Sequence, residues 1–250
     1  RCSQCGVPFC QVHCPLQNNI PDWLKLAAEN RLEEAYEVSH STNNFPEICG
    51  SICPQDRLCE GNCVIEKGFE SVTIGRVEKH ITDTAWKNGW IKPLNPPKEI
   101  DKSIGIIGSG PAGLAAAEEL RKKGYKIEIY DRYDRSGGLL IYGIPNFKLE
   151  KYAVERRTQI LKKGGIVFHN NFEIGKTKSF NFLRKKHDAI LIATGVYKAR
   201  ELDFSEENLG VIVPALDFLI TSNKKGLGDN VPEFDNGKLN SINKNVVVIG

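Results

Sequence analysis

The stretch IGIIGSGPAG, residues 104–113, decides the fold of the larger part of this chain. Its apolar start at 104–107 predicts a short strand, and the alanine-rich run 114–123 after the glycines predicts a helix. Gly124 then ends the helix, and residues 126–130 predict a second strand. A strand, a glycine-rich turn, a helix and another strand are the opening βαβ unit of an α/β domain with a parallel sheet.

Each glycine of this turn has a separate predicted task. Gly108 makes the tight turn, Gly110 lets the backbone approach a pyrophosphate, and Gly113 lets the helix pack closely on the strand. The helix N-terminus supplies an anion site. Asp131 ends the second strand, 23 positions after Gly108, where its carboxylate can accept hydrogen bonds from a ribose. The sequence therefore predicts a dinucleotide-binding, Rossmann-like domain.

The residues that follow favour FAD as this dinucleotide. The glycine motif itself does not distinguish FAD from NAD(P)H, because both use the same fold. Gly137 and Gly138 come after Asp131 at the distance seen in flavoproteins that bind two dinucleotides. Residues 188–195, DAILIATG, predict a buried strand that ends in a turn of small residues, as in the same flavoproteins.

The last fifty residues predict the start of a second nucleotide-binding unit. An apolar segment at 211–220 and a polar loop precede residues 246–249, VVVI, which predict a strand, and Gly250 would be the first glycine of its motif. An ordinary buried strand before a turn is the alternative. On the first interpretation the chain is a fragment, and most of an NADPH site is expected beyond Gly250.

A proline-rich stretch, IKPLNPPKEIDKS at 91–103, separates this α/β part from the residues before it. We therefore expect a helical iron-sulfur domain at 1–95, the first part of an FAD-binding domain at 96–200, and the start of an NAD(P)H-binding domain at 201–250. The predicted fold class is a Rossmann-like α/β FAD-binding domain preceded by an α-helical, ferredoxin-like domain with two [4Fe-4S] clusters.

All eight cysteines lie within the first 63 residues, and this clustering requires a local cause. They are Cys2, Cys5, Cys10, Cys14, Cys49, Cys53, Cys59 and Cys63. A disulfide framework is the less favoured cause, because thiols stay reduced in the cytosol, where a nucleotide-binding domain is expected. Structural zinc usually shows pairs of CxxC knuckles, whereas C-x2-C-x4-C-x3-C-P contains one. The spacing instead favours two [4Fe-4S] clusters.

The ferredoxin rule, in which a fourth cysteine serves the neighbouring cluster, predicts how the ligands pair. The first cluster is expected on Cys2, Cys5, Cys10 and Cys63, and the second on Cys14, Cys53 and Cys59. Cys49 is one candidate for the remaining ligand. Glu78 is the other, because it lies beside an apolar helical stripe, although a solvated helix residue is an alternative interpretation of Glu78.

Composition excludes several other classes of function. The chain has 34 basic and 31 acidic residues, and a net charge of +3 is too small to indicate nucleic-acid binding. No run approaches the roughly 18 apolar residues of a membrane span, and no signal peptide is visible, so we expect a cytoplasmic protein. No catalytic constellation of acid, base or nucleophile is recognisable.

Several longer stretches together resemble the small subunit of bacterial NADPH-dependent glutamate synthase. They are RCSQCGVPFC at 1–10, IPDWLKLA at 20–27, NNFPEICG at 43–50, CPQDRLCEGNC at 53–63, SVTIGRVEKHITD at 71–83 and GGLLIYGIPNFKLEK at 137–151. Related modules occur in dihydropyrimidine dehydrogenase and in a flavin-based transhydrogenase that couples NADPH to ferredoxin. The resemblance covers all 250 residues.

The resemblance implies an electron-input subunit. NADPH would reduce FAD, and electrons would pass through two [4Fe-4S] clusters to a large subunit that makes glutamate from glutamine and 2-oxoglutarate. It implies that the ADP half of FAD is held by Gly108, Ser109, Gly110, Pro111, Ala112, Gly113 and Asp131. It places Gly138, Leu139, Leu140, Gly143, Ile144 and Pro145 toward the flavin ring, and it keeps all eight cysteines, and Glu78, as candidate cluster ligands.

Two alternatives to this function stay open. A ferredoxin-linked NADPH transhydrogenase or a pyrimidine reductase module would share the fold and differ in its partner. A zinc-stabilised, nucleotide-binding interaction protein would transfer no electrons.

Overall fold

The computed structural model describes residues 1–198 and 212–249, and it divides the chain into two compact units, Arg1–Leu94 and Asn95–Gly250. The first unit is helical, and the second is built on a parallel sheet. The predicted fold class, a helical domain followed by a Rossmann-like α/β domain, is confirmed. The predicted boundary between residues 200 and 201 lies outside the described residues.

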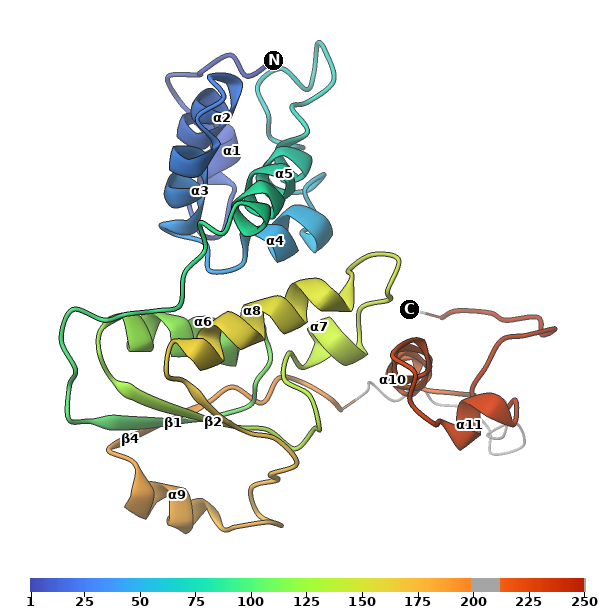
Figure 1. Ribbon diagram of the computed structural model, residues 1–250. Coiled ribbons are helices and arrows are strands. Elements are labelled where there is room, and N and C mark those ends of the chain that lie inside the picture. Colours follow the sequence, from blue (N-terminus) through green and yellow to red (C-terminus); the bar gives the residue numbers. More distant parts are fainter. Residues whose placement is uncertain (199–211, 250) are drawn as a thin grey trace. The chain divides into compact units, whose positions relative to one another are not determined.

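The first unit consists of helices joined by turns (Figure 1). Its helices are α1 (Phe9–Val12), α2 (Ile20–Ala28), α3 (Leu32–His40), α4 (Pro46–Ile52) and α5 (Ile74–Lys87). Trp23 is fully buried, and its Nε1 donates to Asn18 Oδ1 at 2.6 Å. Asn18 in turn donates to the backbone oxygen of Ser39 at 2.7 Å, so α2 and α3 are tied together inside the core. α5 packs on both α3 and α4 and buries Ile81 completely.

The second unit contains a four-stranded parallel sheet with the order β3-β2-β1-β4. The strands are β1 (Ser103–Ile107), β2 (Lys126–Tyr130), β3 (Val167–His169) and β4 (Ala189–Ile192). α6 (Pro111–Lys122) and α8 (Lys151–Lys163) cover one face of the sheet, and α9 (Phe180–Lys186) covers the other (Figure 1). The β1 positions Ile104 and Ile106 pair with Ile127 and Ile129 of β2, so apolar residues run across the sheet in rows.

The register of the strands brings their carboxyl ends to one edge of the sheet. Ile107 of β1 is level with Tyr130 of β2 and with Ile192 of β4. The residues directly after these strands, which include Gly108 and Asp131, therefore meet at this edge. In open parallel sheets the ligand crevice lies outside the carboxyl ends of the strands.

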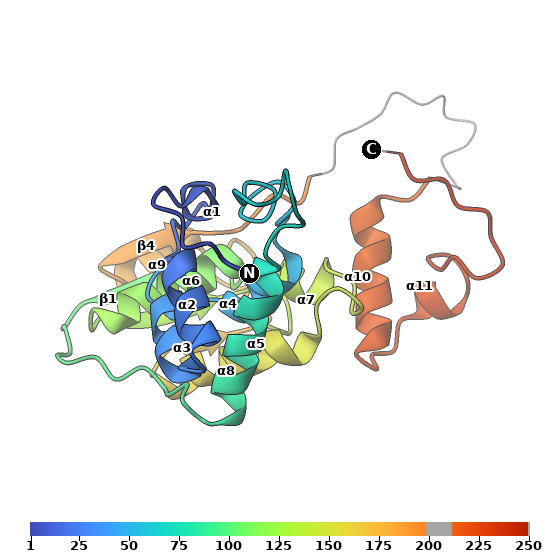
Figure 2. The same cartoon turned by 90° about the horizontal axis from the view of Figure 1, so that it is seen from above.

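A short helix and a C-terminal helical segment follow this edge. α7 (Leu139–Tyr142) comes directly after the glycine pair, and α10 (Ala215–Gly226) lies beside it (Figures 1 and 2). Asn223 of α10 is buried and donates from Nδ2 to the backbone oxygen of Tyr142 at 2.9 Å. α11 (Pro232–Asp235) follows α10, and Asp229 between them accepts two hydrogen bonds from Arg135 at 2.6 and 2.7 Å.

The strand predicted at 246–249 is not formed. These four residues have no regular structure, and Val247 and Val248 are 84% and 83% exposed. The sequence run is apolar enough for a strand, but a strand is stabilised by hydrogen bonds to a neighbour, and no described strand pairs with it. Of the apolar segment predicted at 211–220, Val211 lies outside the described residues and most of the remainder belongs to α10.

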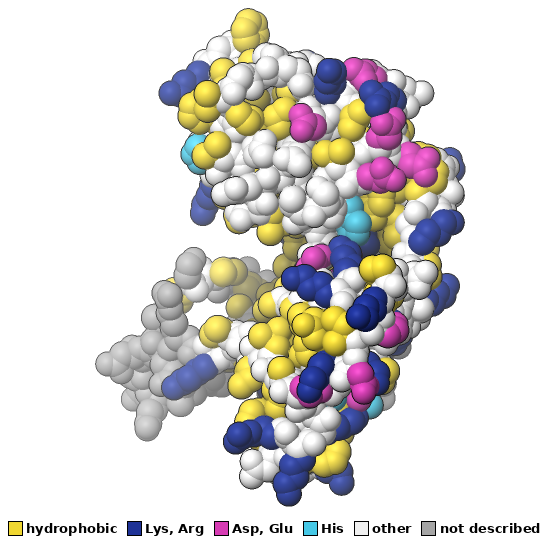
Figure 3. All heavy atoms as spheres, turned by 90° about the vertical axis from the view of Figure 1, so that its left-hand side faces the viewer, with side chains coloured by type: hydrophobic (Ala, Val, Ile, Leu, Met, Phe, Trp, Pro, Cys, Tyr) yellow, Lys and Arg dark blue, Asp and Glu magenta, His cyan; other side chains and the backbone are white. Residues whose placement is uncertain are grey.

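Charges of both signs are mixed on one face of the molecule (Figure 3). On the face drawn in Figure 3, Lys and Arg side chains stand among acidic and apolar ones. None of the helices in the described ranges is long and apolar enough to cross a bilayer.

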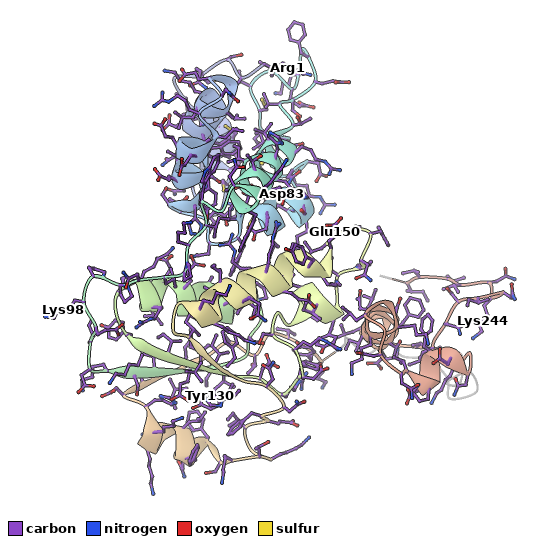
Figure 4. The ribbon with its side chains drawn as sticks, in the orientation of Figure 1. Arg1, Asp83, Lys98, Tyr130, Glu150 and Lys244 are labelled. Carbon is purple, nitrogen blue, oxygen red and sulfur yellow. The ribbon has the colours of Figure 1, made fainter. Side chains whose placement is uncertain are left out.

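A polar cluster on the sheet centres on Glu128 of β2. Its Oε2 accepts hydrogen bonds from Lys186 at 2.5 Å, from His169 at 2.6 Å and from the Tyr130 hydroxyl at 2.9 Å. Burial opposes ionisation, but these three hydrogen bonds lower the pKa of Glu128 to about 2. Tyr130, labelled in Figure 4, also stacks on His169 with ring centroids 4.6 Å apart. The cluster therefore joins β2, β3 and α9.

We expect the substitution Glu128→Gln to lower the free energy of unfolding at pH 7 by ~1–3 kcal/mol, because a charged acceptor of three hydrogen bonds is lost. The folded pKa of about 2 lies below the ordinary value of 4.5. The stabilisation is thus present above pH 4.5 and is lost as the pH falls from 4.5 toward 2. Urea unfolding followed by circular dichroism should show a smaller difference between variant and wild type at pH 4 than at pH 7.

Glu119→Gln is the matched control. Glu119 is an exposed partner of Lys122 at 2.9 Å on α6, and its loss should change stability by less than ~1 kcal/mol. Equal effects of the two substitutions would contradict a special role for the Glu128 cluster.

Candidate cofactor sites

Four cysteines of the helical unit line one hollow. They are Cys2, Cys5, Cys10 and Cys63. Other walls of the hollow are apolar, and they include Phe9, Leu24 and Ile74. Burial raises the pKa of Cys10 to about 11, and the neighbouring Cys2 and Cys63 add to this effect. The structure thus brings together the four cysteines predicted for the first cluster.

Two separate stretches of the chain supply the cysteines of this hollow. Cys10 lies in α1, and Cys63 lies in the turns that precede α5. The N-terminal loop with Cys2 and Cys5 is held by Gln4, whose Nε2 donates to the backbone oxygen of Pro21 at 2.9 Å and to Cys2 Sγ at 3.3 Å. The loop is therefore fastened to α2 independently of any metal.

Of the other four cysteines, Cys49 and Cys53 are paired at the end of α4. Cys49 of α4 is hydrogen-bonded to Cys53, which together with burial raises the pKa of Cys49. Burial raises the pKa of Cys59 to about 12, and Glu78 and Cys14 contribute to the same effect through their charges. Cys14 and Glu78 therefore lie within electrostatic range of Cys59.

Glu78 is buried on α5, so the alternative of a solvated helix residue is wrong. Its Oε1 accepts hydrogen bonds from Asn43 Nδ2 at 3.0 Å and from Ser39 Oγ at 3.3 Å. Burial raises the pKa of Glu78 to about 7, and the charge of Cys53 adds to it. Both Glu78 and Cys49 therefore lie next to Cys53, but one oxygen of Glu78 already has two side-chain partners.

The donor chemistry of the two groups fits iron-sulfur clusters. All eight cysteines are free thiols. No three Cys, His, Asp or Glu side chains within residues 1–198 and 212–249 converge as the ligands of a single metal ion do. A four-iron cluster is held by four thiolates, one on each iron, so its ligands surround the cluster instead of meeting at one atom.

The glycine loop of the α/β unit has three different local geometries. Gly108 has a φ of +106°, and a Cβ there would lie 2.3 Å from the backbone oxygen of Ala193. A Cβ on Gly113 would lie 2.0 Å from the backbone oxygen of Gly108. A Cβ on Gly110 would meet nothing within 4 Å. These geometries match the predicted roles: Gly108 forms a tight turn, Gly113 allows close helix packing, and Gly110 leaves the backbone open to a ligand.

Asp131 fastens this loop to the end of β2. Its Oδ2 accepts hydrogen bonds from the backbone nitrogen of Ser109 at 2.6 Å and from Ser109 Oγ at 2.5 Å. Its Oδ1 accepts one from the backbone nitrogen of Tyr133 at 2.9 Å. A carboxylate oxygen has two lone pairs, so Oδ1 can accept a further hydrogen bond from a ribose hydroxyl.

The glycine pair after β2 packs directly on the same loop. The backbone nitrogen of Gly137 donates to the backbone oxygen of Ser109 at 2.9 Å. Gly138 has a φ of +53°, and a Cβ on it would lie 2.8 Å from the Cα of Gly110. Only a residue without a side chain fits between the loop and α7 here.

A cleft of about 840 Å³ opens at this edge of the sheet, within the usual size range of small-molecule sites. Seven of the predicted residues line it: Gly108, Gly110, Pro111, Ala112, Asp131, Gly138 and Leu139. Six do not line it: Ser109, Gly113, Leu140, Gly143, Ile144 and Pro145. Ser109, Gly113 and Leu140 are buried and support the cleft wall from behind.

Three further residues of the cleft were missed by sequence reasoning. The Arg132 guanidinium lies 4.3 Å from the ring centroid of Tyr197 and 5.0 Å from that of Tyr133. All three line the cleft beside Asp131. Flat aromatic and guanidinium groups are the surfaces on which a nucleotide base stacks. The one signal in the sequence was the position of Arg132 and Tyr133 directly after the acidic residue.

Comparison with protein families identifies both units. Residues 1–90 match the family described as dihydropyrimidine dehydrogenase domain II, 4Fe-4S cluster. Residues 106–170 match the NAD(P)-binding Rossmann-like domain. The chain therefore joins a stretch similar to a 4Fe-4S domain to a stretch similar to a Rossmann-like NAD(P)-binding domain.

Along its whole length the chain is similar to the glutamate synthase [NADPH] small chains, which confirms the resemblance. It is 66% identical to that of Azospirillum brasilense over 251 residues, which cover 100% of this chain and 52% of the relative. It is 43% identical to that of Escherichia coli (strain K12) over 250 residues, which cover 100% of this chain and 53% of the relative. The chain thus spans about half the length of these curated relatives.

Similarity to solved structures is partial. The Mycobacterium tuberculosis protein FprA in complex with NADPH matches 52% of this chain and 29% of its own, with 23% sequence identity and a TM-score of 0.45.

Proposed function

We propose that the chain is part of the electron-input subunit of a glutamate synthase. It would bind FAD in the cleft at the carboxyl edge of the sheet and hold two [4Fe-4S] clusters in its helical unit. NADPH would be the reductant, and a large partner subunit in the cytoplasm would make glutamate from glutamine and 2-oxoglutarate. One observation carries the proposal: the helical unit that precedes a dinucleotide cleft gathers Cys2, Cys5, Cys10 and Cys63 around one hollow.

The two kinds of site have complementary chemistry. When bound, FAD would accept two electrons as a hydride from NADPH, and the clusters would carry electrons onward one at a time. The residues of this chain bind and orient these groups, and none of them has to act as an acid, base or nucleophile. The apolar walls around Cys10, which include Leu24 and Ile74, would restrict access of water to the first cluster.

FAD is favoured over NADPH in this cleft for an electrostatic reason. The Asp131 carboxylate is buried in the cleft wall, beside the position expected for a ribose. It suits the free hydroxyl groups of the FAD ribose, and it would repel the 2′-phosphate of NADPH. The open face of Gly110 would admit the pyrophosphate, and Arg132 with Tyr197 would stack on the adenine.

For the second cluster we propose Cys49 in preference to Glu78 as the fourth ligand. Cys49 is hydrogen-bonded to Cys53, which was predicted as a ligand of the same cluster. Glu78 instead holds Asn43 and Ser39 and so ties α5 to α3 and to the segment before α4. Glu78 then supports the cluster site without binding iron.

We expect NADPH to bleach the flavin and cluster absorption of the protein, prepared without oxygen and at its natural length. The reduced protein should then form glutamate when the large subunit, glutamine and 2-oxoglutarate are added. Bound zinc without acid-labile sulfide, or the absence of bound flavin, would overturn the proposal.

A second candidate acceptor is favoured by one observation. The helical unit matches a family described by dihydropyrimidine dehydrogenase, so this unit is not confined to glutamate synthases. A ferredoxin or a pyrimidine-reducing partner should therefore be tested in parallel. Rapid reoxidation by ferredoxin, with none by the large subunit, would favour the alternative.

A further inference from the structure

The short helix α7 is fastened at its carbonyl end by side chains from two other helices. The last carbonyls of a helix lack partners within the helix and require them from elsewhere. Lys151 of α8 donates from Nζ to the backbone oxygen of Leu140 at 3.0 Å and to that of Ile144. Asn223 of α10 donates to that of Tyr142 at 2.9 Å. The other end of α7, with Leu139, forms part of the wall of the dinucleotide cleft.

A lysine is unusual as the hydrogen-bond donor to these backbone oxygens, because it buries a positive charge. The residue is 6% exposed, directly after the labelled Glu150 at the start of α8 (Figure 4). It has no carboxylate partner in the described parts of the chain, and burial lowers the pKa of its ammonium to about 8. An unpaired buried ammonium is costly, whereas the neutral amide of Asn223 caps the same helix end without that cost. Hydrogen bonding alone therefore does not account for a lysine at this position.

We propose that Lys151 is a positioning residue of the dinucleotide site that acts through its charge as well as its hydrogen bonds. It holds α7 so that Gly138 and Leu139 stay at the cleft wall, and its ammonium offsets the negative charge of the bound dinucleotide. This inference rests on the proposed binding of FAD. The diphosphate of FAD carries negative charge, and α7 is about 6 Å long, so the cation lies roughly one helical turn behind the wall. At that range in a protein a charge changes affinity on the order of tenfold.

The test compares three variants of the protein at its natural length, prepared without oxygen. Lys151→Met removes the charge and both hydrogen bonds, Lys151→Arg keeps the charge, and Asn223→Ala removes the neutral cap from the same helix end. We expect Lys151→Met to raise the Kd of FAD about tenfold and Asn223→Ala about threefold or less. Lys151→Arg, which keeps the positive charge, should have a Kd for FAD within about threefold of that of the wild type.

A second readout separates charge from structure. Reduction adds negative charge to the flavin, so Lys151→Met should lower the midpoint potential of bound FAD, while Asn223→Ala should leave it unchanged. Equal effects of Lys151→Met and Asn223→Ala on both quantities would overturn the inference, as would failure of Lys151→Arg to restore the Kd. If the wild type itself retains no FAD, the proposed function fails instead. If Lys151→Met does not fold, Lys151→Gln, which also lacks the charge, takes its place in both comparisons.

Discussion

Replacement of Cys10 by serine is expected to remove one iron-sulfur cluster and to leave the other, so that iron falls from about eight to about four atoms per chain. Cys10 lines the hollow with Cys2, Cys5 and Cys63, and burial beside Cys2 and Cys63 raises its pKa. A serine hydroxyl is a poor substitute for a thiolate ligand. Iron and acid-labile sulfide in protein purified without oxygen are the quantities to measure.

Cys59→Ser is the matched variant in the second group. It should also halve the iron, and the combination of Cys10→Ser with Cys59→Ser should remove nearly all of it. Retention of all the iron in Cys10→Ser would contradict the proposed grouping. Loss of all the iron in either single variant would mean that the clusters do not form independently.

The fourth ligand of the second cluster can be identified in the same way. We expect Cys49→Ser to lose that cluster and Glu78→Gln to keep it, because an amide at position 78 still accepts hydrogen bonds from Asn43 and Ser39. The opposite result would make Glu78 the ligand.

Local sequence patterns predicted much of the α/β unit. The strands predicted at 104–107 and 126–130 correspond to β1 and β2, and the helix predicted at 114–123 corresponds to most of α6. These elements were accessible because the glycine turn, the apolar strands and the alanine-rich helix each have a short-range signature. The strand predicted at 246–249 is absent from the structure. An apolar run indicates strand propensity, but a strand also requires a neighbouring strand to pair with, which the run itself does not provide.

Tertiary contacts between residues far apart in the chain could not be predicted from the sequence. Arg132 and Tyr197 meet because β2 and β4 end at the same edge of the sheet, and their spacing in the chain gives no sign of it. The burial of Lys151 is equally hidden, because lysines at helix starts are usually exposed. The cysteines are an intermediate case. The ferredoxin rule predicted the partners of Cys63, and the hollow contains those partners, but which residue completes the second group stays a prediction.

Valine at Gly110 is expected to raise the Kd of FAD about 100-fold while leaving the fold intact. Gly110 has a φ of −69°, which any residue can adopt, and a Cβ on it would meet nothing within 4 Å, so the protein itself tolerates a side chain there. The empty space belongs to the cleft, where the pyrophosphate has to approach the backbone. Overpacking a site by a few carbon atoms costs ~1–3 kcal/mol, and 1.4 kcal/mol is a factor of ten in Kd.

Gly113→Ala is the matched control, because it should have the opposite pattern. A Cβ there would lie 2.0 Å from the backbone oxygen of Gly108, so α6 must shift and the free energy of unfolding should fall by about 1–3 kcal/mol, even without FAD. Fluorescence titration with FAD and urea unfolding of the FAD-free protein distinguish the two effects. If Gly110→Val binds FAD as tightly as the wild type, the dinucleotide does not lie against this loop, and the motif at 104–113 shapes the fold without holding a cofactor.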